Sequence, residues 1–143
     1  RPGELNGVHY YFVSAQEFDA MIERGDMLEW ALVHGKNKYG TPRGPVDEAL
    51  AAGKPVLLEI DLAGARQVRT NRPDAQFIFL APPSWEELER RLIGRGTESP
   101  EEQALRLATA RVELQAASEF DHVVINDDVE RAVDELARLI GLE

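Results

Sequence analysis

The sequence predicts an α/β protein in which a parallel sheet is flanked by helices. Three short apolar runs, at residues 55–61, 76–80 and 121–126, have the length and composition of buried strands. Stretches with helical periodicity separate these runs, and strands joined by helical crossovers pair in parallel. The chain has 143 residues, of which 43% are hydrophobic and 29% charged, and this is enough for one domain with a buried core.

The first third of the chain departs from this alternation and predicts a small mixed α+β layer. Residues 10–13 are strand-like, and Ser14 begins a capping box with Glu17 that opens a helix. Gly25 is a suitable residue to end that helix. Residues 28–42 combine glycine, tyrosine and polar side chains, a composition that is typical of turns and short strands.

Helix signals follow the apolar runs in the rest of the chain. Residues 62–71 place their apolar side chains along one stripe. Ser84 and Ser99 each occupy the N-cap position of a capping box, and the helix that Ser99 opens is expected to run to about Ser118. The last helix has one apolar face, and Asp127 is its natural N-cap.

Composition and charge exclude several classes of function. The chain carries 26 acidic and 16 basic side chains, and this net charge of −10 argues against binding to nucleic-acid polymers or anionic membranes. The absence of cysteine excludes disulfides, thiolate metal sites and a cysteine nucleophile, and the three histidines lack the spacing of a zinc site. Because no apolar run approaches the ~18 residues of a membrane span and no signal peptide opens the chain, we expect a cytoplasmic protein.

Glu59 and Asp61 end the first apolar run and are candidates for chemistry. Residues two apart on a strand point to the same face, so both carboxylates are expected on one side of the sheet. Ligands of open parallel sheets bind at the carboxyl ends of the strands, where Asn126 also follows its predicted strand. The alternative is structural in both places: a strand that ends in a solvated polar segment, and a polar residue that precedes a helix cap.

A group of arginines stands out in this acidic chain. Its members lie between residues 90 and 111 and are Arg90, Arg91, Arg95, Arg106 and Arg111. The planar guanidinium donates two parallel hydrogen bonds and keeps its charge, which suits a partner that carries phosphate. Alternatively, these arginines pair with the glutamates of residues 86–102 on a solvated helical surface.

Taken together, the motifs resemble those of guanylate kinases, in the family's order and over almost the whole chain. The match begins with Arg1-x-x-Glu4-x-x-Gly7-x-x-Tyr10-x-Phe12 and continues with Leu28–Ala31, Tyr39–Thr41, Leu58–Ala65, Ala81–Ser84, Gly94–Thr97 and Asn126–Asp128. The resemblance implies a P-loop-kinase-type parallel sheet flanked by helices, with a small mixed α+β layer that binds GMP and a helical lid.

The resemblance also implies which residues bind GMP. The family positions that bind its phosphate are matched by Arg1, Tyr10 and Tyr39. The positions that contact the guanine are matched by Glu29, Thr41 and Asp61. Thr41 retains the hydroxyl of the serine that some family members carry there. A carboxylate that accepts hydrogen bonds from the guanine ring N–H and exocyclic amine would select guanine over adenine.

On the donor side, the resemblance implies ATP with Mg²⁺. The lid arginines that close over the donor phosphates are matched by Arg91, Arg95 and Arg106. Glu59 matches an acidic position beside the metal and the phosphates, and Asn126 matches a position near the donor adenosine. No residue is assigned as a direct metal ligand.

Family members begin with a strand and a Gly-x-x-x-x-Gly-Lys-Ser/Thr P-loop, which has no counterpart in this sequence. That loop cradles the donor phosphates and its hydroxyl holds Mg²⁺. We therefore expect a segment of about 30 or more residues, including the central strand of the sheet, ahead of Arg1, and we expect these 143 residues alone to be inactive. A deliberate fragment and a domain that has abandoned catalysis are the alternatives.

The resemblance therefore predicts a guanylate kinase, which transfers the γ-phosphoryl group of Mg-ATP to GMP in purine nucleotide metabolism. Residues 1–42 would form the GMP-binding region, residues 43–89 and 111–143 the core, and residues 90–110 the lid. The alternative is a catalytically inactive guanylate-kinase-like domain that binds a protein partner.

Overall fold

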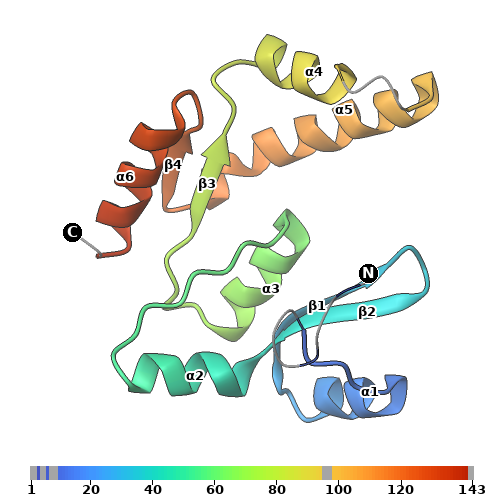
Figure 1. Cartoon of the computed structure of the whole chain (residues 1–143), viewed down its shortest axis with the longest axis vertical. Helices are drawn as coiled ribbons and strands as arrows, with labels where there is room; N and C mark the ends of the chain where they lie inside the picture. Colours follow the sequence, from blue (N-terminus) through green and yellow to red (C-terminus); the bar gives the residue numbers. More distant parts are fainter. Residues whose placement is uncertain (1–2, 4–5, 7–9, 95–97, 142–143) are drawn as a thin grey trace. The chain divides into compact units, whose positions relative to one another are not determined.

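The computed structural model describes residues 3, 6, 10–94 and 98–141 and contains both helices and short strands (Figure 1). Contacts divide the chain into two units, Arg1–Asp74 and Ala75–Glu143. The first unit contains an antiparallel pair of strands and the second a parallel pair, so the predicted α/β class with a small mixed layer is confirmed. None of the helices in the described ranges is long and apolar enough to cross a lipid bilayer.

The first unit is built around a hairpin of β1 (Met27–Val33) and β2 (Asn37–Pro42), preceded by α1 (Ala15–Glu23). The predicted cap of α1 is present, because the Ser14 hydroxyl accepts a hydrogen bond from the Glu17 N–H at 3.1 Å. The helix and the start of β1 enclose a small core in which the side chains of Phe18, Met27 and Leu28 are buried.

The hairpin turn explains how residues 28–42 combine two strands in so short a segment. His34 and Gly35 have φ angles of 54° and 66°, and the Lys36 N–H donates to the Val33 carbonyl at 3.2 Å. Positive φ at both central residues defines a type I′ turn, whose twist matches that of the flanking strands. The turn therefore brings β2 back along β1 in antiparallel register, with Glu29 opposite Thr41.

Helix α3 (Leu62–Asn71) confirms the predicted helix and packs on β1. Its inward face consists of the buried residues Gly64, Ala65 and Val68. Asp61 caps its N-terminus, since the Asp61 Oδ1 accepts a hydrogen bond from the Gly64 N–H at 2.8 Å. Figure 1 shows α3 lying alongside the hairpin.

Helix α2 (Arg43–Ala51) is an element that we did not predict from the sequence. It begins directly after β2, where the Arg43 N–H donates to the Asp26 carbonyl at 2.7 Å, and only Val46 among its residues is buried. The proline at position 45 lies in the first turn, where a missing N–H costs no helical hydrogen bond. One buried residue leaves almost no apolar periodicity to detect.

Two predicted strands do not form. Residues 55–61 have no strand partner among the described residues, and the side chain of Leu57 is 68% exposed. A strand requires backbone hydrogen bonds to a neighbour, and an apolar run supplies only the side chains. Residues 10–13 are likewise irregular: Tyr10 bridges to Asn6, whose Oδ1 accepts a hydrogen bond from the Phe12 N–H at 2.8 Å.

In the second unit, β3 (Ile78–Ala81) and β4 (His122–Ile125) pair in parallel, as the apolar runs predict. Helices α4 (Trp85–Ile93) and α5 (Pro100–Gln115) connect them, with a short 3₁₀ helix at Ala116–Glu119, and α6 (Val129–Leu139) follows β4. The strands bury Ala81 and Val124, and Phe79 packs edge-on against Phe120 with ring centroids 5.2 Å apart.

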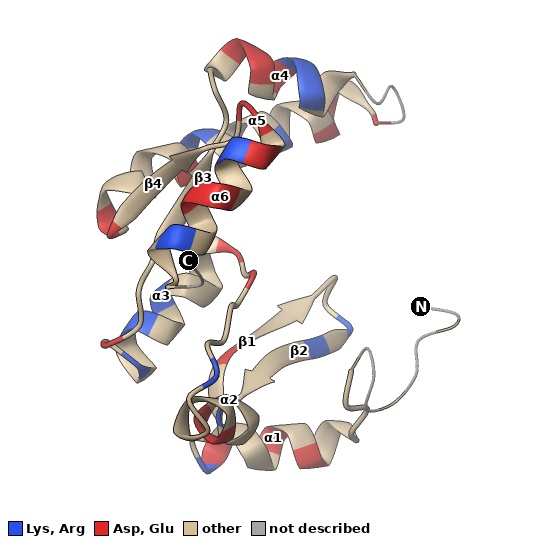
Figure 2. Cartoon of the chain, turned by 60° about the vertical axis from the view of Figure 1, so that its left-hand side comes forward, with Lys and Arg blue, Asp and Glu red and all other residues tan. Residues whose placement is uncertain are grey.

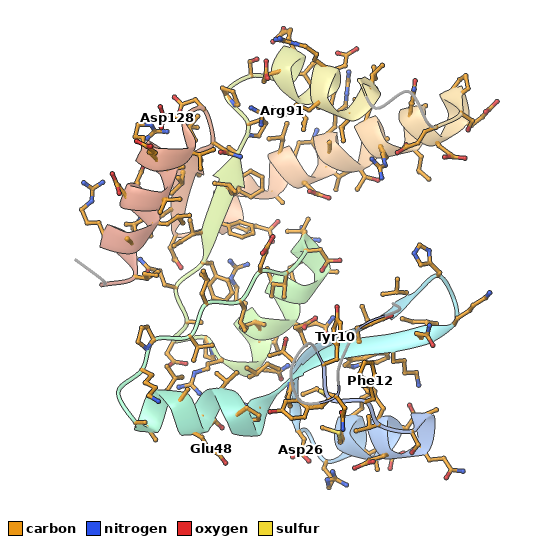
Figure 3. The ribbon with its side chains drawn as sticks, viewed as in Figure 1. Tyr10, Phe12, Asp26, Glu48, Arg91 and Asp128 are labelled. Carbon is orange, nitrogen blue, oxygen red and sulfur yellow. The ribbon has the colours of Figure 1, made fainter. Side chains whose placement is uncertain are left out.

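The helix caps of the second unit confirm two predictions and correct a third. The hydroxyls of Ser84 and Ser99 accept hydrogen bonds from the N–H groups three residues on, at 3.1 and 3.2 Å. The N-cap of α6 is Asp128 rather than Asp127 (Figure 3). The Asp128 Oδ1 accepts from the Arg131 N–H at 3.0 Å, whereas the Asp127 carboxylate is bound to the Arg131 guanidinium.

Candidate functional site

An open pocket of about 590 Å³ lies beside the β1–β2 hairpin of the first unit. It has the size of a site for a small organic ligand. Its lining includes six residues that the sequence singled out, namely Tyr10, Glu29, Tyr39, Thr41, Glu59 and Asp61. Every described residue that was expected to contact GMP therefore lies on one pocket, together with Glu59.

Glu29 is the buried charge of this pocket. Its side chain is 9% exposed, and among the described residues it is the one polar or charged residue in the core. The Thr41 hydroxyl, on the facing position of β2, donates a hydrogen bond to the Glu29 Oε1 at 2.8 Å. A buried carboxylate is costly without donors, so the threonine both stabilises Glu29 and orients its carboxylate plane.

The Asp61 carboxylate approaches Glu29 across Gly64. A Cβ atom built on Gly64 would lie 3.1 Å from both the Asp61 Oδ1 and the Glu29 Oε2. The two carboxylates thus converge on one glycine although they belong to different elements, one the strand β1 and the other the N-cap of α3. Together they make a wall of hydrogen-bond acceptors.

The two tyrosines expected at the phosphate of GMP are neighbours. The rings of Tyr10 and Tyr39 meet edge to face with centroids 5.7 Å apart, and their side chains are about half exposed. Figure 3 labels Tyr10 next to the hairpin. A phenol is amphipathic, so this arrangement packs the rings together while the hydroxyls can reach a ligand.

Gly40 lets the strand that carries Tyr39 and Thr41 approach β1 closely. A Cβ atom at this position would lie 2.7 Å from the Glu29 carbonyl oxygen and 3.0 Å from the Trp30 Cβ. No side chain fits there without moving one strand away from the other.

The predicted lid residues belong to the second unit. The Arg91 Nε bonds the Glu87 Oε1 at 3.2 Å, and the Arg106 Nη1 bonds the Glu98 Oε1 at 2.9 Å. Figure 2 shows red acidic and blue basic segments next to one another along the ribbon of α4. This is the paired helical surface that the sequence offered as the alternative, and the lid role of these residues stays a prediction. Arg95 and Arg1 lie outside the described residues.

Asn126 directly follows β4 in the second unit. Its backbone N–H donates to the Ala81 carbonyl at 2.7 Å and so continues the parallel ladder beyond the last strand residue. The residue is half-buried and stands at the carboxyl end of the strand pair, which is where the sequence analysis expected it.

Two polar residues of α3 support the pocket and were missed from the sequence. The Gln67 side-chain amide accepts from the Trp30 N–H at 3.0 Å and donates to the Trp30 carbonyl at 2.9 Å. The Asn71 Nδ2 donates to the Leu28 carbonyl at 2.9 Å. Their spacing of four residues on the helix, next to the buried stripe, was the available signal.

The carboxylates of the pocket are also its candidates for binding a cation. Among the described residues no group of three or more histidine or acidic side chains could hold a metal ion. Of the pocket carboxylates, Glu59 is an exposed residue of the lining and is not one of the residues expected to contact GMP. Mg²⁺ in nucleotide sites is typically bound through one or two carboxylates, waters and the phosphates themselves, and this donor set fits that chemistry.

Comparison with known proteins gives one consistent result. A model of the family "Guanylate kinase" matches residues 1–143. The guanylate kinase of Thermobifida fusca (strain YX) is 62% identical over 141 residues, which are 99% of this chain and 71% of that protein. The guanylate kinase of Streptomyces coelicolor is 60% identical over 142 residues, 99% of this chain and 72% of that protein. The crystal structure of guanylate kinase from Anaplasma phagocytophilum matches with a TM-score of 0.74 at 33% identity, over 99% of this chain and 69% of that one.

Proposed function

The chain belongs to the guanylate kinase family, whose reaction is the transfer of the γ-phosphoryl group of ATP to GMP, and we propose that the hairpin pocket is its GMP site. Its function as an ATP:GMP phosphotransferase follows from this membership. The observation that carries the site assignment is the convergence of Glu29, Thr41 and Asp61 in one pocket. We further propose that the reaction serves purine nucleotide metabolism in the cytoplasm.

The acceptor wall of Glu29 and Asp61 explains a preference for guanine. Guanine presents a ring N–H and an exocyclic amine on one edge, and carboxylate oxygens accept from both. Adenine presents an acceptor nitrogen at the equivalent ring position, so Glu29 would receive no hydrogen bond from that base position and would keep only the one from Thr41. Sites built to pair with a polar group reject analogues that lack it, because the groups of the site are then left unpaired.

The phosphate end of GMP is assigned to Tyr10 and Tyr39, with Arg1. The phenol hydroxyls can donate hydrogen bonds to phosphate oxygens, and the edge-to-face contact keeps the two rings next to one another. An arginine adds a charge-assisted, two-pronged contact. The base and the phosphate would then lie at opposite ends of the same hairpin pocket.

The donor side is assigned to Glu59, Asn126 and the arginines at positions 91, 95 and 106. Bound Mg²⁺ would neutralise charge on the phosphates of ATP. The arginines would donate hydrogen bonds to the oxygens that gain charge during transfer, while Glu59 would orient the hydrated cation. Because a phosphate oxygen of GMP is the nucleophile, the chain needs no strong general base.

Calorimetry of the 143-residue chain with GMP and with AMP tests the proposal. We expect GMP to bind and AMP to bind about 10- to 100-fold more weakly, since a buried acceptor left without its donor costs about 1–3 kcal/mol. Glu29→Gln should reduce the preference for GMP, and Glu48→Gln, an exposed glutamate of α2 labelled in Figure 3, is the control. Equal affinity for the two nucleotides would overturn the site assignment.

A further inference from the structure

Among the described residues, the edge of β1 that faces away from β2 is bound by side chains of α3 and not by another strand. Residues 28 and 30 present their backbone groups to the edge that faces away from β2. There Gln67 makes two hydrogen bonds to the backbone of Trp30, and Asn71 makes one to the carbonyl of Leu28. The backbone is thus held on both sides of Glu29 by the same helix.

The same helix also controls the other carboxylate. Asp61 is its N-cap, and the bond from the Gly64 N–H fixes the Asp61 Oδ1 at the first turn. Gly64 in turn leaves the space into which the Glu29 Oε2 extends. A helix is stiff over ten residues, so the distance from its cap to Gln67 is set by the rise of about 1.5 Å per residue.

We infer that α3 sets the spacing of the two base-reading carboxylates, with Gln67 and Gly64 as positioning residues for the recognition of guanine. Gln67 fixes the strand on which Glu29 stands, and Gly64 keeps the gap between Glu29 and Asp61 open. Neither residue needs to touch the nucleotide. This inference rests on the proposed GMP site.

Correct spacing matters most for the exocyclic amine of guanine. A carboxylate in the right place accepts from the ring N–H and from the amine at once, whereas a displaced one keeps only one of the two bonds. IMP has the ring N–H but lacks the amine. A displaced carboxylate should therefore weaken the binding of GMP more than the binding of IMP. A general loss of structure would weaken the binding of both nucleotides alike.

The first test is Gln67→Met, which keeps the length of the side chain and removes both hydrogen bonds to Trp30. Calorimetry of the 143-residue chain should show GMP affinity falling about tenfold and IMP affinity about threefold or less, because one hydrogen bond is worth about 1.5 kcal/mol. Gln16→Met, at an exposed position of α1 in the same unit, is the matched control and should leave both affinities unchanged.

The second test is Gly64→Ala, which decides the matter even where Gln67→Met unfolds the unit. The added Cβ atom would lie 3.1 Å from both carboxylates and 3.3 Å from the Ile60 Cβ. Because the methyl group presses on both carboxylates, it should lower the preference for GMP over IMP about tenfold, and circular dichroism checks that the variant is folded. Gly44→Ala is the matched control, because a Cβ atom at this glycine in the first turn of α2 meets nothing within 4 Å.

The outcomes separate the inference from the function on which it rests. A lower ratio of GMP to IMP affinity in folded Gly64→Ala supports the positioning role. An unchanged ratio in folded Gly64→Ala overturns it, while the wild-type chain still binds GMP. A wild-type chain that does not distinguish GMP from AMP overturns the GMP site itself.

Discussion

At the scale of single residues, the hydrogen bond from Thr41 to Glu29 is the contact that makes a buried carboxylate tolerable in this pocket. It joins the two strands of the hairpin at facing positions, with the Thr41 Oγ1 2.8 Å from the Glu29 Oε1. The carboxylate is therefore oriented before any ligand binds, and ordering its side chain costs less free energy on binding.

Substitutions of Thr41 test this preorganisation. Thr41→Val has nearly the same shape but no hydroxyl, so it leaves the Glu29 Oε1 without that donor. We expect GMP affinity to fall about tenfold, whereas Thr41→Ser, which keeps the hydroxyl, should lose about threefold or less. Calorimetry with GMP measures both; similar losses in the two variants would show that the hydroxyl has no role.

Most residues of this pocket were found from the sequence by resemblance, whereas Glu59 and Asp61 were also singled out by a physical pattern, as carboxylates at the end of an apolar run. Tyr10, Tyr39 and Thr41 carry no periodicity or charge signal, and only their order along the chain pointed to a site. Gln67 escaped notice because an amide on a helix is ordinarily a solvated side chain. Its role depends on the edge of β1 that faces away from β2, which no local signal in the chain reveals.

At the scale of elements, side-chain caps made the helices predictable. Ser14, Ser84 and Ser99 each accept the hydrogen bond that a capping box implies. Strands were less predictable, because residues 55–61 have the apolar composition of a strand without a neighbour to pair with among the described residues. Helix α2 was missed since it buries a single side chain, Val46.

The start of α6 shows how a second acidic residue changes a cap. Arg131 binds the Asp127 Oδ1 through its Nε at 3.0 Å and the Glu135 Oε2 through its Nη1 at 2.9 Å. It also donates to the Ile125 carbonyl at the end of β4. The guanidinium therefore links β4 to α6, and Asp128 is left to cap the helix.

This ion pair makes a prediction about pH. The hydrogen bond from Arg131 lowers the pKa of Asp127 below its usual value. A carboxyl whose folded pKa is lowered contributes stability above its unfolded pKa, and that contribution is lost as the pH falls through the folded value. We expect wild type to exceed Asp127→Asn in stability at pH 7 and this difference to shrink below about pH 4.

Urea unfolding of the two proteins at pH 7 and pH 3 measures the difference. The expected effect is small, because both side chains are about half exposed and salt screens them. Asp134→Asn, an exposed carboxylate of the same helix, is the control. A difference in the free energy of unfolding between wild type and Asp127→Asn that is the same at both pH values would contradict a stabilising role for the ion pair.

At the scale of the whole molecule, the net charge of −10 does not reveal that acidic and basic residues of the two units are proposed to bind different parts of the substrates. The carboxylates that we propose to contact the guanine lie in the pocket of the first unit, while the arginines proposed for the donor phosphates belong to the second unit. The net charge of a chain therefore does not indicate whether it binds nucleotide phosphates, since phosphoryl transfer needs a few placed cations and not a basic surface.

Family membership rests on the length of the match, which spans residues 1–143.

The lid assignment makes a prediction for catalysis. In an enzyme that carries these residues behind a P-loop segment of the family, Arg91→Ala should lower kcat about 100-fold, because it removes a donor to charge that develops during transfer. Arg90→Ala is the matched control, as Arg90 also pairs with Glu87 but is 75% exposed. Steady-state rates at saturating GMP and ATP measure kcat for both variants. Equal losses of kcat in Arg91→Ala and Arg90→Ala would contradict the lid role of Arg91.

The most direct test of the central claim is a crystal structure of the 143-residue chain with GMP bound. We expect the guanine edge to lie within hydrogen-bond distance of the Glu29 and Asp61 carboxylates, and the phosphate to lie beside the hydroxyls of Tyr10 and Tyr39. GMP bound outside the hairpin pocket, or bound there with its base turned away from Glu29, would contradict that claim.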